Sequence, residues 1–156
     1  MSAYPYPLQI FGIYDRGKAN SERIVLRVYA PPVDLRFYAL VLGHAAPENT
    51  VIPLQDQFLW LGPTVIQVPS WIFVFTGAGS TGISQETTTK DPVHLMFWNR
   101  TEVMLASKQI YPTLIRMDHI EIGRQDATPV GNLLQQQPST ELAEALRKLI
   151  ADNIKG

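Results

Sequence analysis

Cysteine is absent from the 156 residues of the chain, and its absence excludes several kinds of chemistry. Disulfide bonds, thiolate nucleophiles, and zinc or iron–sulfur sites built on cysteine cannot form. A chain of this length buries a core without cross-links or a structural metal, so we expect a single domain. The cytoplasm is the simplest compartment for such a protein, and we expect this location.

Charge is also sparse, and neither sign dominates. Charged residues make up 17% of the chain, and 13 basic against 14 acidic residues give a formal net charge of -1. No overall field attracts the chain to phosphate backbones or anionic lipids, which disfavours nucleic acid as a partner. Long apolar runs of the roughly 18 residues that a membrane helix needs are missing, and residues 1–7 lack the regions of a secretory signal. We therefore expect neither export nor a membrane span.

Proline, with 12 residues, and short apolar segments are plentiful instead, which favours strands and turns. The clearest strand is residues 21–30, where Ile24, Leu26 and Val28 alternate with residues of the opposite face. Further candidates are residues 8–14, 37–43, 57–61, 65–76, 93–98, 103–106 and 113–122. Because Pro69 interrupts one of these segments, we expect two short strands or a bulged edge strand there. The spacing is typical of an antiparallel sandwich or barrel.

The C-terminal part of the chain has neither the composition nor the periodicity of strands. Residues 124–138 contain three consecutive glutamines among turn-forming residues, which indicates a tether. Residues 139–154 have helical periodicity, with Ser139 as the expected N-cap. The apolar stripe of this helix consists of Leu142, Leu146, Leu149 and Ile150. Such a stripe either packs on the parent sandwich or docks on another copy or another protein.

Several short motifs between residues 9 and 82 occur in an order that resembles a known family. ERIVL at residues 22–26 is followed by PVDL at 32–35 and YAL at 38–40. WIFVF at 71–75 then leads into the small-residue loop GAG at 77–79. This order resembles that of the lamin tail domain, an immunoglobulin-like β-sandwich found in nuclear lamins and in many bacterial proteins.

The resemblance implies an immunoglobulin-like antiparallel β-sandwich. With the strand spacing and the C-terminal pattern, we expect an all-β fold with this sandwich over residues 4–123, followed by the tether at 124–138 and the amphipathic helix at 139–154. Members of the family are usually non-enzymatic modules that bind proteins or DNA, or that accompany another activity in a longer chain. No catalytic residue is carried over. The chain departs from the family between residues 93 and 123, where we find no asparagine-containing turn followed by a glycine hairpin. The helix has no counterpart in the minimal domain.

A nucleotide site is an alternative, because Gly77, Gly79 and Gly82 fit the Gly-x-Gly-x-x-Gly pattern of dinucleotide-binding folds. Arg100 follows at the distance where a Rossmann unit places its ribose contacts, so its side chain could meet the 2′-phosphate of NADP. This segment resembles the end of the second strand in some NADP-dependent dehydrogenases of the shikimate type. Residues 83–91 argue against this interpretation, since one apolar residue and a run of threonines do not predict the crossover helix. We favour a glycine–threonine loop between strands.

Catalytic and metal sites are not indicated. His44, His94 and His119 stand far apart and have no further ligand at the spacing of a metal site, so we expect neither a metal nor a cofactor. No serine has a nucleophile-elbow context, and no acidic pair suggests acid–base catalysis. Phe97 and Trp98 are adjacent and must point to opposite faces of a regular strand, so one of them is a candidate for an exposed surface.

The function expected from the sequence is a non-catalytic binding or assembly module, whose partner is a protein or a second copy of the chain. Its candidate binding residues are Gly77, Gly79, Gly82, Trp98, Arg100, Leu142, Leu146, Leu149 and Ile150. The alternatives are an NADP-dependent dehydrogenase-like nucleotide-binding protein and a carbohydrate-binding β-sandwich, the second supported only by the tryptophans.

Overall fold

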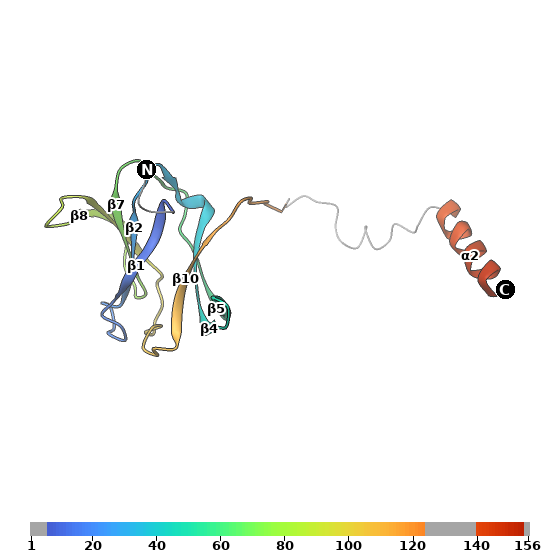
Figure 1. The fold of residues 1–156 in the computed structure, drawn as a ribbon, viewed down its shortest axis with the longest axis horizontal. Coiled ribbons are helices and arrows are strands. Elements are labelled where there is room, and N and C mark those ends of the chain that lie inside the picture. Colours follow the sequence, from blue (N-terminus) through green and yellow to red (C-terminus); the bar gives the residue numbers. More distant parts are fainter. Residues whose placement is uncertain (1–5, 124–139, 155–156) are drawn as a thin grey trace. The chain divides into compact units, whose positions relative to one another are not determined.

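The structure, a computed structural model, describes residues 6–123 and 140–154, without the side chains of residues 140–143. It divides into two units, residues 1–120 and residues 121–156. The first unit carries the described strands and the second carries the helix (Figure 1). The expected tether and the N-cap Ser139 lie outside the described residues.

The elements follow one another along the chain, and their bounds can be given together. They are β1 (Leu8–Tyr14), β2 (Arg23–Val28), β3 (Val33–Asp34), the 3-10 helix η1 (Leu35–Phe37), β4 (Tyr38–Ala46), β5 (Thr50–Trp60), β6 (Val65–Ile66), β7 (Ser70–Phe75), β8 (Gly82–Gln85), β9 (Pro92–Phe97), β10 (Ile110–Arg116) and α2 (Thr140–Ile154). The expected β-rich fold with one C-terminal helix is confirmed. Pro69 separates β6 from β7, as two short strands.

Two main sheets build the first unit and face each other (Figure 1). One sheet has the order β1-β2-β7-β9-β8 and the other the order β10-β4-β5, while β3 and β6 form a small separate ladder. The pairings among the described strands are antiparallel except for β7 with β9, which is parallel. The expectation of an antiparallel sheet is wrong at this point. β8 lies between β7 and β9 in the sequence but pairs with β9 on the side away from β7. The chain in residues 76–91 therefore reverses direction twice, and β9 runs parallel to β7.

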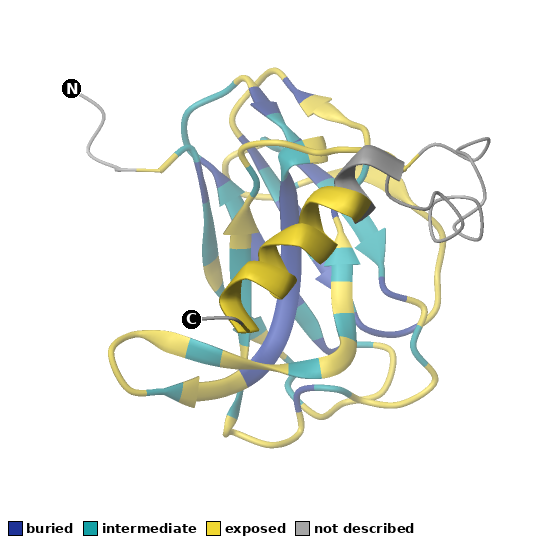
Figure 2. Ribbon diagram, turned by 90° about the vertical axis from the view of Figure 1, so that its right-hand side faces the viewer, coloured by how far each residue is buried: buried dark blue, intermediate teal, exposed yellow. Residues whose placement is uncertain are grey.

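One hydrophobic core lies between the two sheets (Figure 2). Ile24, Leu26 and Val28 of β2 are fully buried, as their alternation predicts. They belong to the same cluster as Ile72 of β7 and Leu40 of β4, which are also fully buried. Burying one such side chain away from water contributes about 2 kcal/mol to the free energy of folding. This shared core holds the two sheets together.

Three segments differ from the sequence-based expectation. Residues 103–106 belong to the connection between β9 and β10, because the backbone amides of Met104 and Leu105 donate to the buried Glu22 carboxylate and not to a strand. β10 begins at Ile110 and ends at Arg116, so the expected strand 113–122 is shifted toward the N-terminus. β8 forms where a loop was expected. No described helix has the length and apolar character to cross a membrane.

Candidate binding site

The glycine-rich segment leads into a strand, not into a helix. Gly77 and Gly79 lie in the connection after β7, and Gly82 is the first residue of β8. Gly79 lies so close to the Phe97 ring that a Cβ there would overlap the ring atoms. Its amide donates to Asn99 Oδ1 at 3.1 Å. A pyrophosphate site of the dinucleotide type requires a helix N-terminus after the glycines, and β8 stands in its place.

Trp98 and Arg100 hold the β unit together. Trp98 is 8% exposed and belongs to the core, and its amide donates to the carbonyl oxygen of Phe75 at 2.8 Å. The ring that reaches the outer face is Phe97, which stacks on Phe75 with 5.1 Å between ring centroids. The Arg100 guanidinium donates to the carbonyl oxygen of Asp56 in β5. The expectation that Trp98 forms part of a binding surface is therefore wrong, because the chain turns inward after β9.

The turn between β8 and β9 is closed by the carboxylate of Glu86. It accepts hydrogen bonds from the amide of Thr88 at 2.9 Å and from the hydroxyl of Thr89 at 2.8 Å, and also from the Thr89 amide. The Glu86 amide donates to the carbonyl oxygen of Asp91 at 2.9 Å. These threonines, which the sequence placed in a loop, thus form part of a bonded hairpin.

The same donors lower the pKa of Glu86 to about 2, mainly through the backbone amide of Thr89. Because the carboxyl loses its proton more readily in the folded turn, the turn is stabilised above the ordinary pKa of 4.5, and this stabilisation is lost as the pH falls through about 2. We expect the side-chain NMR signals of Glu86 to titrate near pH 2, and the amide signals of Thr88 and Thr89 to move with them. A Glu86 titration near pH 4.5 would contradict the bonded turn.

The outer face of the five-stranded sheet carries arginines stacked on aromatic rings. The Arg27 guanidinium lies 4.5 Å from the centroid of the Trp71 ring and pairs with Asp91 at 2.7 Å. Arg23 pairs with Asp15 at 2.7 Å and lies over neighbouring rings on the same face. A groove of about 280 Å³ opens between these residues and the Glu86 turn. Each arginine has one acidic partner, while Arg23 Nε, Arg27 Nη1 and Trp71 Nε1 are buried on this face without a hydrogen-bond acceptor among the described residues.

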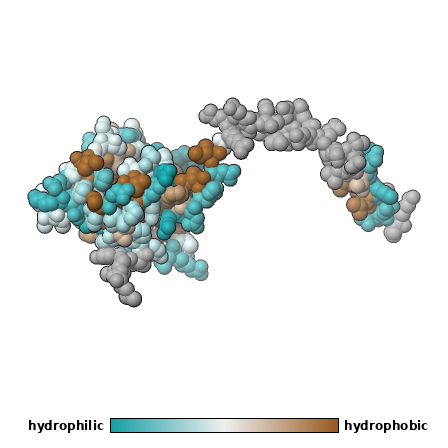
Figure 3. All heavy atoms as spheres, turned by 90° about the horizontal axis from the view of Figure 1, so that it is seen from above, coloured by the Kyte–Doolittle hydropathy of each residue, from teal (hydrophilic) through white to brown (hydrophobic). Residues whose placement is uncertain are grey.

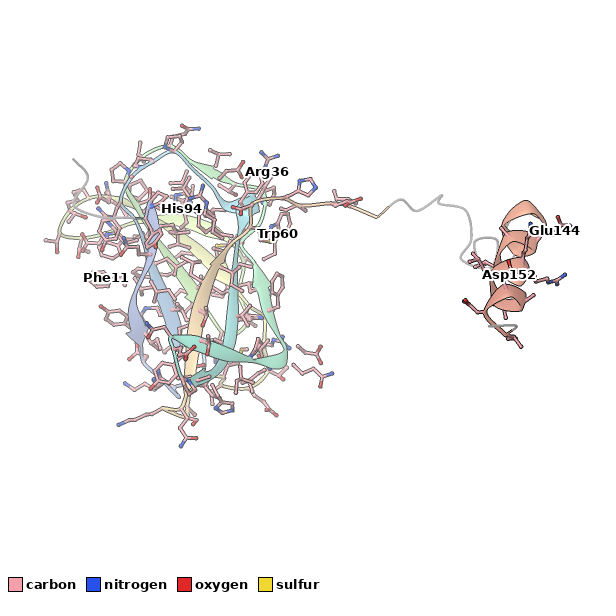
Figure 4. The ribbon with its side chains drawn as sticks, turned by 45° about the vertical axis from the view of Figure 1, so that its right-hand side comes forward. Phe11, Arg36, Trp60, His94, Glu144 and Asp152 are labelled. Carbon is pink, nitrogen blue, oxygen red and sulfur yellow. The ribbon has the colours of Figure 1, made fainter. Side chains whose placement is uncertain are left out.

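The three tryptophans do not form a common platform for a sugar. Trp98 is buried, and Arg27 covers a face of Trp71. Trp60 is 46% exposed, and its indole nitrogen donates to the carbonyl oxygen of Arg36 at 2.8 Å (Figure 4). A carbohydrate stacks on a ring face that is open to solvent, and among the tryptophans Trp60 is the most exposed.

A larger groove, of about 510 Å³, lies along the inner side of β8 and β9. The five-stranded sheet extends further than the three-stranded sheet, so the inner face of this hairpin is only partly covered. Ile83 is 73% exposed there, while His94 and Met96 are half-buried. The lining contains no Asp, Glu, Lys or Arg. Burial lowers the pKa of His94, which favours the neutral form of the imidazole.

The helix α2 exposes its apolar stripe. The side chains of Leu146, Leu149 and Ile150 are 49%, 61% and 60% exposed, and the side chain of Leu142 is not described. Glu144 lies on the same helix (Figure 4), two residues before Leu146 in the sequence. Hydrophobic side chains therefore reach the surface of both units (Figure 3).

Known proteins give no guide to the function. No protein-family model matches the chain, and no curated protein or solved structure is significantly similar to it. Among the described residues, no three His, Asp or Glu side chains come together as metal ligands. Function must therefore be inferred from the surfaces of the molecule.

The sequence reading missed Glu22, the buried anchor of the β unit. Glu22 is 1% exposed, and its carboxylate accepts four hydrogen bonds. The sequence contained a signal for this burial, because Glu22 belongs to the same set of alternate residues as Ile24, Leu26 and Val28. Alternation therefore places its side chain on the buried face of β2.

Proposed function

We propose that the chain is a non-catalytic assembly module, in which α2 associates with α2 of a second copy. The exposed stripe of Leu146, Leu149 and Ile150 supports this proposal most strongly. A row of large apolar side chains on one side of a helix is typical of a surface that another element covers. Glu144 and Lys148 lie on the opposite side of α2.

The helix is poorly equipped to stand alone in water. It has 15 residues, a length at which isolated helices are only marginally stable. Its last turn contains no basic residue, and Asp152 lies near the C-terminal end, where the helix dipole disfavours a negative charge (Figure 4). Docking of the stripe supplies the stability that the isolated helix lacks.

The sequence of the helix suits pairing with itself. Leu142, Leu146 and Leu149 recur with the four-and-three spacing of a coiled-coil seam, and Asn153 occupies the next position. Between residues 144 and 154, Glu144 and Asp152 balance two basic residues. Two copies therefore meet without net charge repulsion.

The β unit would be the part that the assembly carries, and we propose an immunoglobulin-like fold of the lamin tail kind for it. In immunoglobulin domains, strands A, B and E are neighbours in one sheet, and strand C lies in the other. β1, β2 and β7 are neighbours in the same way, with β4 in the facing sheet. The parallel β7–β9 pair departs from this pattern.

Two aspartate substitutions in α2 test the assembly. Leu146→Asp places a charge in the stripe, whereas Ala151→Asp places the same side chain on the side of Glu144 and Lys148. We expect Leu146→Asp to reduce the molar mass measured by light scattering to that of one chain, and Ala151→Asp to leave it unchanged. The control has at least as large a helix-propensity cost, because alanine is the best helix former. Equal masses for Leu146→Asp and the unmodified chain would refute the proposal.

A further inference from the structure

The edges of the two main sheets are not equally protected against pairing with another strand. β5 contains Pro53, and Asp56 within it has a positive φ of 59°. β10 contains Pro112, and β1 has a bulge between Ile10 and Gly12. Proline, charge and bulges are among the features by which natural sheets block edge pairing, and a short edge strand is another. Each of these three edges therefore carries a protective feature.

β8, the fourth edge, has no proline, charge or bulge, and its short length is the only one of these protective features that it has. Its four residues, Gly82 to Gln85, include no proline and no charge, and its register with β9 is regular. All four are exposed, and no atom lies within 4 Å of a Cβ built on Gly82. β9 takes one side of β8, and no described strand lies on its other side. The backbone groups on that side are therefore accessible to an incoming chain.

The uncharged groove of about 510 Å³ lies beside this open edge. Ile83 and His94 are register partners and face the groove, with Met96 further along β9. Trp60 lines the groove from the other sheet. A strand added to β8 would direct every second side chain toward this groove, because side chains alternate between the faces of a sheet. The lining is apolar, so apolar side chains suit these positions.

We propose that β8 binds an extended peptide segment of a partner protein as a sixth strand, with apolar side chains at alternate positions filling the groove. Main-chain hydrogen bonds would supply affinity and the groove would supply specificity, as in other cases of strand addition. A second copy of this chain is a poorer occupant. β8 of a second copy has one apolar residue, Ile83, to offer the groove, and two four-residue strands bury far less than the roughly 1,200–2,000 Å² of a stable interface.

Synthetic peptides and the full chain test this inference. The probe is the octapeptide Lys-Val-Thr-Leu-Thr-Val-Thr-Lys, extended to a panel in which Ile, Phe or Met replaces the apolar residues. The control has the same composition with its apolar residues adjacent, Lys-Val-Val-Leu-Thr-Thr-Thr-Lys. In amide NMR spectra, we expect saturable shifts of residues 82–85 and of the groove lining with the alternating panel. N-methylation of the amides along one edge of the peptide should abolish these shifts, and along the other edge it should preserve them.

A pair of lysine substitutions locates the site. Ile83→Lys puts a charge on the edge strand, and Thr87→Lys puts the same charge in the adjoining turn, outside the groove. We expect Ile83→Lys to weaken peptide binding roughly tenfold or more, and Thr87→Lys to leave it unchanged. Unchanged amide signals elsewhere will show that both variants are folded.

Three results would overturn the inference. The first is the absence of saturable shifts with every alternating peptide, and the second is equal binding of the control peptide. The third is a shift of residues 82–85 on raising the protein concentration without peptide, which would assign the edge to a second copy. All three are read at β8, so they are independent of whether α2 forms assemblies.

Discussion

Replacing Glu22 by alanine is expected to lower the free energy of unfolding by about 4 kcal/mol, because it leaves buried donors without an acceptor. Glu22 Oε2 accepts from the amides of Gly17 at 2.7 Å and Leu105 at 3.0 Å. Oε1 accepts from the hydroxyl of Thr76 at 2.8 Å and the amide of Met104 at 2.8 Å. One carboxylate therefore ties together three connections of the β unit.

Urea denaturation measures this effect, with Glu102→Ala as the matched control. Glu102 is exposed in the connection between β9 and β10, which also contains Met104 and Leu105, and its loss should change the free energy of unfolding by less than about 0.5 kcal/mol. Glu22→Gln should lie between the two, because its amide nitrogen cannot accept from two of the four donors. If Glu22→Ala and Glu102→Ala had equal stability, the role of Glu22 as an anchor would be wrong.

Replacing Gly43 by alanine should have the second large effect, about 3 kcal/mol, through overpacking in the β4–β5 ladder. A Cβ on Gly43 would overlap Val51 Cγ1 and the carbonyl oxygen of Ile52. Because Ile52 belongs to β5, which pairs with β4, relief would require the two strands to separate. The ladder already has a register shift between Val41 and Gly43.

Gly82→Ala is the control for this prediction, since a Cβ on Gly82 meets no atom within 4 Å. We expect it to be neutral or slightly stabilising, because alanine restricts the unfolded chain. Urea denaturation of both variants gives the comparison. Similar midpoints for Gly43→Ala and Gly82→Ala would mean that β4 and β5 are not packed as closely as described.

The sequence predicted correctly those elements in which apolar residues recur with the regular period of a strand or a helix. The alternation around Ile24, Leu26 and Val28 identified β2 and its buried face, and the leucine spacing identified α2. Residues 103–106 have the composition of a strand, but their amides are taken by Glu22, a contact more than 80 residues distant in the sequence. β8 forms because it pairs with β9, and its own composition favours a loop.

The candidate sites also fall into those that the local sequence predicts and those that depend on the arrangement of the sheets. The apolar stripe of the helix follows directly from its sequence, and so does the glycine pattern of Gly77, Gly79 and Gly82. The groove beside β8 does not, because it depends on one sheet being wider than the other and on β9 lying between β7 and β8. The strand order of a sheet leaves little trace in a single sequence. For the same reason, the burial of Trp98 could not be distinguished from exposure.

Sedimentation equilibrium of the unmodified full chain tests the central claim, association through α2, most directly. One chain has a mass of 17.5 kDa. Association of two copies predicts a mass that rises with concentration toward twice this value and returns to that of one chain on dilution. A mass of 17.5 kDa at every concentration would contradict the account.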